Sequence, residues 1–137
     1  TEIVQELRTN APNNGTPWKL IVQVTSNDRH RHNVLLDETE RLLKTAKQNR
    51  EQVVIQILAN SKGINLLKAN NQYVSSRMQK LSQQYNNLIL TACGQTLKKL
   101  KLKNQPVPQL LNEATIVHSA IQEAIQKQKQ GWTYIKI

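Results

Sequence analysis

Short runs of β-branched and other apolar residues recur along this chain, and segments with helical spacing separate them. The first three runs span Lys19–Ser26, Gln52–Ala59 and Asn87–Ala92. Apolar and polar residues do not alternate cleanly in the first run, which is typical of a strand covered on both faces. Strands that alternate with helices predict an α/β fold with a mostly parallel sheet.

The remaining segments complete this pattern. The segment NDRHRHN, at residues 27–33, is predicted as a loop and helix start, and helical spacing follows at Asn33–Lys47. Further helices are predicted at Gln72–Tyr85, from Gly94 to about Leu102, and over Ile121, Ala124, Ile125 and Gln128. A short helical piece is expected after the break NSKG, at residues 60–63. A fourth strand is predicted at Thr115–Ser119 and a fifth, alternating, edge strand at Trp132–Ile137. The sequence therefore predicts three α/β/α layers around a mostly parallel five-stranded sheet.

The length of the chain suits one domain preceded by a leader. Its 137 residues bury enough surface to fold without disulfides. Residues 1–17 are expected to form a partly helical or flexible leader, with a short helix at Thr1–Arg8 and a turn-rich part at Asn10–Pro17. Residues 18–137 form the predicted domain. No apolar run approaches the roughly 20 residues that span a membrane, so no membrane partner is expected.

The charge of the chain indicates what it attracts. The formal net charge is +10, from 19 Lys and Arg against 9 Asp and Glu. Such a surface favours acidic proteins or small oxyanions. Nucleic acid is a less favoured partner, because aromatic residues are few and no nucleic-acid motif is present.

The only cysteine, Cys93, follows the third run and directly precedes a predicted helix. Unpaired N–H groups and the helix dipole at such a position favour a thiolate. Gly94 lets the backbone pass close to a bound anion, and Gln95 and Thr96 add hydrogen-bond donors. The alternative is that Cys93 is a small core residue, which is the commoner role of a buried cysteine.

Other candidate residues follow the second and fourth strands. In an open parallel sheet, ligands bind beyond the carboxyl ends of the strands. Asn60, Lys62 and Gly63 follow the second strand, and His118 lies at the end of the fourth. We expect these residues to line the ligand end of the sheet with Cys93.

Metal and cofactor sites are not expected. His30 and His32 lie near Asp28, but their spacing is poor for chelation and no second Cys or His pair completes a set. Gly-x-Gly-x-x-Gly and P-loop motifs are absent.

Two segments carry a resemblance to a known family. These are ACGQTLKKLKL, at residues 92–102, and TIVHSAIQEAIQKQKQGWTYIKI, at residues 115–137. They resemble the DsrE/DsrF-like family, in its single-domain branch with an ACGNTL-type cysteine segment. The likeness extends over roughly Trp18–Ile137 and implies a compact α/β fold and a homo-oligomer, a trimer or a multiple of trimers. Wider relatives carry sulfur as a cysteine persulfide, and Cys93 occupies a similar place.

Two functions follow as hypotheses. In the first, Cys93 accepts sulfur as a thiolate and passes it to a partner thiol, because the chain holds no second cysteine. In the second, Cys93 is structural and the protein is a non-catalytic oligomeric module that binds an anionic ligand or a protein. A lone reactive thiol favours the cytoplasm, whereas a signal peptide removed before Thr1 would place the protein in the periplasm.

Overall fold

The computed structural model describes residues 17–70 and 73–137. The predicted leader therefore lies almost wholly outside the described residues. The elements are β1 (Trp18–Val24), α2 (Arg29–Asn49), β2 (Val53–Ala59), the 3₁₀ helix η1 (Ser61–Leu67), α3 (Tyr73–Gln84), β3 (Leu88–Cys93), α4 (Gly94–Leu102), β4 (Ala114–Val117), α5 (Ala120–Lys129) and β5 (Thr133–Lys136).

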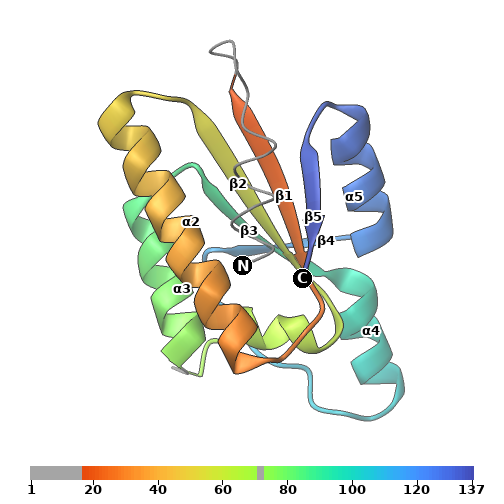
Figure 1. Cartoon of the computed structure of the whole chain (residues 1–137). Helices are drawn as coiled ribbons and strands as arrows, with labels where there is room; N and C mark the ends of the chain where they lie inside the picture. Colours follow the sequence, from red (N-terminus) through yellow and green to blue (C-terminus); the bar gives the residue numbers. More distant parts are fainter. Residues whose placement is uncertain (1–16, 71–72) are drawn as a thin grey trace.

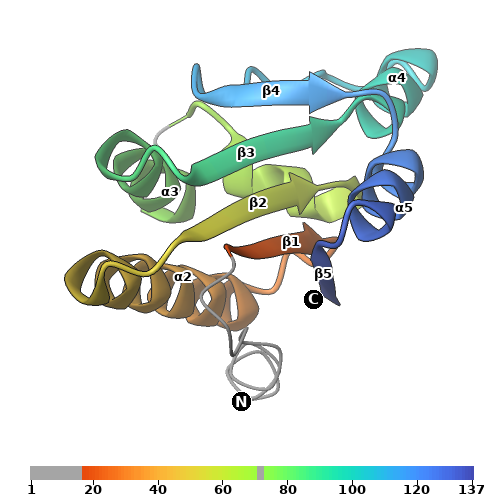
Figure 2. The same ribbon diagram turned by 90° about the horizontal axis from the view of Figure 1, so that it is seen from above.

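The five strands form one sheet in the order β4-β3-β2-β1-β5. Every neighbouring pair is parallel, which confirms the predicted parallel sheet. Helices cover both faces of the sheet, with α2 and α3 on one side and α5 on the other (Figure 1). Because all strands are parallel, their carboxyl ends meet at one edge, and α4 and α5 lie toward that edge (Figure 2).

The two faces of the sheet differ in what they bury. The face under α2 and α3 carries the larger cluster, which includes Leu20, Ile57 and Leu90. The opposite face carries a small cluster that contains Cys93. Ala120 and Ala124 pack α5 against this second face, because small side chains let a helix approach a sheet closely. The described part of β1 confirms a strand buried on both faces, as its burial is continuous from Leu20 to Val24.

Helix α2 begins at Arg29, within the segment at residues 27–33 that was expected to hold its start, because Asp28 caps it by accepting the N–H of Arg31 at 3.1 Å. One segment differs from the prediction. The segment NSKG was expected to break the chain. Instead, η1 begins at Ser61, inside this segment, and places Gly63 within the helix.

The apolar residues that marked α5 do not all face the core. Ile121 is 72% exposed and Ile125 is 49% exposed, whereas Ala120 and Ala124 are buried. Helix α4 contains no buried residue. The face of the sheet that holds Cys93 therefore has a thinner cover than the opposite face.

Candidate functional site

Cys93 ends β3 and is the N-cap residue of α4. Its backbone is extended, and its side chain makes no capping bond to its own helix. The residue is 4% exposed and belongs to the cluster beneath α5. The single thiol of the chain therefore lies under the first turn of α4, at the carboxyl edge of the sheet.

Hydrogen-bond donors surround the sulfur of Cys93. Burial raises the pKa of the thiol, because a thiolate loses solvation inside the protein. Four neighbouring donors act in the opposite direction by stabilising the thiolate, namely the hydroxyl of Thr96 and the backbone N–H groups of Thr96, Ala120 and Gln95. The combined effect of these donors on the pKa outweighs that of burial, so the pKa of Cys93 lies below its ordinary value. The site thus favours the thiolate, the nucleophilic form of cysteine.

The donors come from the first turns of two helices. Thr96 and Gln95 belong to α4, whereas Ala120 is the first residue of α5. Strand β4 pairs with β3 so that Val117 lies opposite Cys93, and the chain then turns into α5 three residues later. Unpaired N–H groups and positive dipole ends of both helices therefore converge on one sulfur atom.

A side-chain cap and a polar network hold α5 in this position. Ser119 is the N-cap residue and accepts the N–H of Gln122 at 3.1 Å. Glu123 accepts a bond of 2.7 Å from Nε2 of Gln56, which lies on β2 beneath the helix. The same Nε2 donates to the hydroxyl of Thr91 at 3.2 Å. These bonds tie α5 to the sheet and so keep its first N–H group near the thiol.

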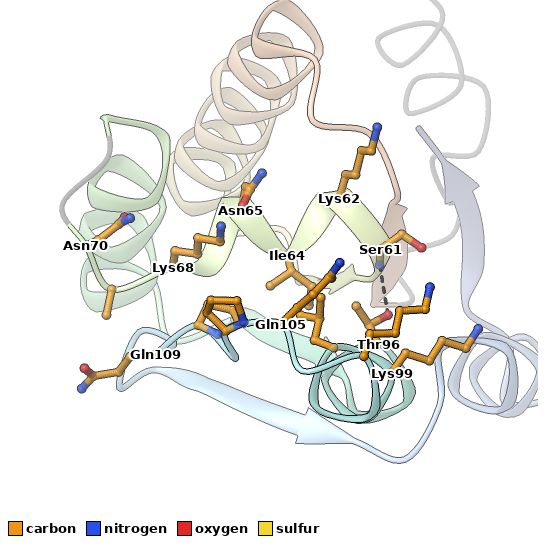
Figure 3. Close-up of a pocket in the computed structure, with 15 residues that line it drawn as sticks. Ser61, Lys62, Ile64, Asn65, Lys68, Asn70, Thr96, Lys99, Gln105 and Gln109 are labelled. Carbon is orange, nitrogen blue, oxygen red and sulfur yellow. Dashed lines mark hydrogen bonds between the residues drawn. The ribbon is translucent and has the colours of Figure 1, made fainter.

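The hydroxyl of Thr96 connects the thiol to the segment after β2. Its Oγ1 accepts the N–H of Ser61 at 3.0 Å (Figure 3). The N–H of Ser61 occupies a lone pair of the Thr96 oxygen, so the single hydrogen of the Thr96 hydroxyl remains free to donate to the sulfur of Cys93. Ser61 adopts a φ of 53°, in the left-handed region that non-glycine residues seldom occupy. Such conformations gather at functional sites, where the surrounding structure maintains them.

Two glycines allow the loops at this edge to pack closely. A Cβ on Gly63 would lie 1.9 Å from the carbonyl oxygen of Val24. A Cβ on Gly94 would lie 2.8 Å from the carbonyl oxygen of Val117 and 3.2 Å from that of His118. The space beside Gly94 is therefore filled by the chain after β4, and its N–H group is not among the donors that lower the pKa of Cys93.

The other predicted residues have different surroundings from those of the thiol. The side chain of Asn60 accepts a bond of 3.2 Å from Gln23 on β1. The exposed Lys62 lines a separate cavity. His118 is exposed, and within the described residues its ring has no hydrogen-bond partner. The structure thus brings together Cys93, Gln95 and Thr96, whereas Asn60, Lys62 and His118 are not among the groups that lower the pKa of the thiol.

Sequence reasoning missed Ala120 and Ser61. Neither has a side chain that suggests chemistry, since each contributes through its backbone N–H group. The only sequence signal for Ala120 was its place after a short strand and before a helix, with a serine as N-cap residue. Ser61 lies in the segment at residues 60–63 that was expected at the ligand end of the sheet, but the sequence did not single it out among those residues.

The histidines considered as metal ligands have another environment. His32 is buried, and its Nε2 lies 2.6 Å from the carbonyl oxygen of Ser26. His30 is exposed. In the ranges 17–70 and 73–137, no three His, Cys, Asp or Glu residues are grouped as metal ligands would be. Within the same ranges, none of the helices combines the length and apolar character needed to cross a bilayer.

Comparisons with known proteins agree with this architecture. The sequence model of the DsrE/DsrF-like family matches residues 19–137. Among solved structures, the chain is similar to the protein of unknown function MTH1491 from Methanobacterium thermoautotrophicum, with 24% identity and a TM-score of 0.72. That match covers 88% of this chain and 99% of the other, and it shows a shared fold. The curated proteins gave no match.

Proposed function

The chain belongs to the DsrE/DsrF-like family, and on that premise we propose that it carries sulfur as a persulfide on Cys93. The family is generally linked to sulfur relay. The observation that carries the proposal is the convergence of two helix N-termini and the Thr96 hydroxyl on the sulfur of Cys93, which lowers the pKa of the thiol.

The reaction needs no cofactor. The Cys93 thiolate attacks the outer sulfur of a donor persulfide, R–S–SH, so that a new S–S bond forms and the donor S–S bond breaks. The donor leaves as the thiolate R–S⁻, and the sulfur stays on Cys93 as Cys–S–SH or its anion. An acceptor thiolate then attacks the outer sulfur and releases the Cys93 thiolate. A small sulfur oxyanion such as thiosulfate would act as donor in the same way, with sulfite as its leaving group.

The acceptor thiol must come from another chain, because Cys93 is the only cysteine of the sequence. The net charge of +10 favours an acidic relay protein as that partner. A thiol that must return to its reduced form fits a reducing compartment such as the cytoplasm. We further propose a homo-oligomer as the working form, a trimer or multiple of trimers as the family resemblance implies; the exposed side chains of Ile116, Ile121 and Ile125 support an interface but not its stoichiometry.

The proposal is tested by mass spectrometry after incubation with glutathione persulfide. The expected result is a gain of one sulfur atom, reversed by a thiol, in the native chain and no gain in the Cys93→Ser variant. A native chain that gains no sulfur would overturn the proposal.

The second candidate function is a non-catalytic oligomeric binding module in which Cys93 only packs. The observation that favours it is the burial of Cys93, which leaves 4% of the residue exposed to a donor. On this view, the Cys93→Ser variant keeps its assembly and ligand binding, and the native chain takes up no sulfur.

A further inference from the structure

A cavity of about 620 Å³ lies between η1, α4 and the segment that follows α4 (Figure 3). Its volume is within the range of roughly 300–1,000 Å³ that is typical of small-molecule sites. Thr96 borders this cavity, but Cys93 does not line it. The cavity is therefore next to the proposed sulfur site without being part of it.

The walls of the cavity are tied together by backbone hydrogen bonds. The N–H of Leu111 donates to the carbonyl of Leu67 at 2.9 Å, and the N–H of Ala69 donates to that of Gln109 at 2.8 Å. At the other end, the Ser61 N–H bond to Thr96 joins η1 to α4. Because three separate segments are fixed to one another, the cavity is largely formed before any ligand enters.

Positive charge gathers around the cavity without compensation. Four lysines line it and no acidic residue does: Lys62, Lys68, Lys99 and Lys103. None of the four forms an ion pair within residues 17–70 and 73–137, where the salt bridges all involve arginine. Like charges around a concave surface raise the local potential and attract anions.

The spacing of the lysines indicates more than one anionic group. Lys62 and Lys68 lie at opposite ends of η1. At about 2 Å of rise per residue in a 3₁₀ helix, their backbones are about 12 Å apart. Lys99 and Lys103 are neighbours on one side of α4, since they are four residues apart. The side chains of Lys62 and Lys68 extend from the two ends of η1 without converging on one point, so each end offers a place for a separate anionic group (Figure 3).

Part of the cavity wall is apolar, and uncharged polar side chains line the rest: Ser61, Asn65, Asn70, Thr96, Gln105 and Gln109. The apolar part includes the buried side chain of Ile64 and the side chains of Leu100, Pro106 and Pro108. Apolar walls with a few polar groups are typical of sites for organic ligands. A ligand that satisfies both features has an apolar or planar body and two or more anionic groups.

We propose that this cavity is a binding site for an organic phosphate that combines such a body with several negative charges, as a nucleoside triphosphate does. The proposal goes beyond sulfur transfer and holds whichever role Cys93 has. The Lys62 and Lys99 ammonium groups pair with phosphate at the end near Thr96, while Ile64 and Leu100 cover the body of the ligand.

The proposal is tested by titration calorimetry at low salt with three probes. Adenosine triphosphate has both the planar organic group and the anionic phosphates, inorganic triphosphate has the phosphates alone, and adenosine has the organic group alone. We expect adenosine triphosphate to bind at least tenfold more tightly than either of the others. No binding of adenosine triphosphate at millimolar concentration would overturn the proposal, and so would equal binding of inorganic triphosphate.

Matched double variants separate the cavity from the general surface charge. Lys62→Gln with Lys99→Gln should weaken binding of adenosine triphosphate by about tenfold, because two phosphate contacts are lost. Lys44→Gln with Lys80→Gln removes the same charge from exposed positions on α2 and α3 and should change binding less than twofold. Equal weakening by both pairs would overturn the proposal. The Cys93→Ser variant should bind as the native chain does, so failure of sulfur transfer is distinguishable from failure of this site.

Discussion

Replacing Thr96 with valine tests whether its hydroxyl stabilises the thiolate. Valine keeps the branched shape but removes the donor to the sulfur of Cys93. A hydrogen bond to a charged group contributes about 1.5–3 kcal/mol, and we take the lower end because Thr96 is partly exposed. The pKa of Cys93 should rise, and since about 1.4 kcal/mol is a factor of ten, the thiolate population on the acidic side of the titration should fall about tenfold.

The assay is the rate of alkylation of Cys93 by iodoacetamide as a function of pH. The signal is unambiguous because the chain has one cysteine. A thiolate of higher pKa is intrinsically more nucleophilic, with a Brønsted coefficient of about 0.4–0.5, which offsets the tenfold loss by about threefold. The net rate of the Thr96→Val variant on the acidic side should therefore be about three- to fourfold lower, and its whole profile should move to higher pH.

The matched control is Thr96→Ser, which keeps the hydroxyl and should titrate close to the native chain. If the valine and serine variants give the same profile as the native chain, the Thr96 hydroxyl does not stabilise the thiolate. A shift in both variants would mean that the methyl group, and not the hydroxyl, controls the environment of the thiol.

Three further outcomes are expected. Gly63→Ala should unfold the chain or lower its free energy of unfolding in urea by several kcal/mol, because the added Cβ would lie 1.9 Å from a carbonyl oxygen of β1. Its control, Gly131→Ala, has open space around the added Cβ but a φ of 90°, and should lower the free energy of unfolding by about 1 kcal/mol. Because the pKa of Cys93 is lower in the folded chain, its thiolate adds to the free energy of unfolding above the unfolded-state thiol pKa of about 8.5, and this contribution is lost as pH falls through the folded pKa. Cys93→Ser should remove this pH-dependent contribution, and equal urea profiles of both chains at every pH would contradict it. Ser119→Ala should lower the free energy of unfolding by about 1 kcal/mol through loss of the α5 cap, and an unchanged urea midpoint would refute that role.

Much of the fold could be predicted because its signals are local. Leu20, Ile57 and Leu90 lie in apolar runs that are too short to form helices. The runs are also too continuous for strands with one solvent-exposed face, so they predict strands buried on both faces. The terminal strand alternates, and it is an edge strand of the sheet. The start of α2 lies in the predicted loop at residues 27–33, and the cap at Asp28 decides its exact position.

The candidate site was predictable only in part. The place of Cys93 between a strand and a helix indicated donors from Gln95 and Thr96, because those residues follow it in the same helix turn. Ala120 was not predictable in this way, since it contributes a backbone group from a different helix. His118 is exposed and has no hydrogen-bond partner among the described residues, so a polar residue at a strand end need not be held in the site.

The sequence by itself determined which segments become strands and helices, because periodicity and capping act between residues a few positions apart. It also determined that the single thiol lies where a strand passes into a helix. The tertiary structure decided which backbone groups surround that thiol and which lysines share a cavity. Those arrangements join Cys93 to Ala120, and Ser61 to Thr96, across neighbouring strands. Strand order and the path of each connection bring such residues together, and no local pattern encodes either of them.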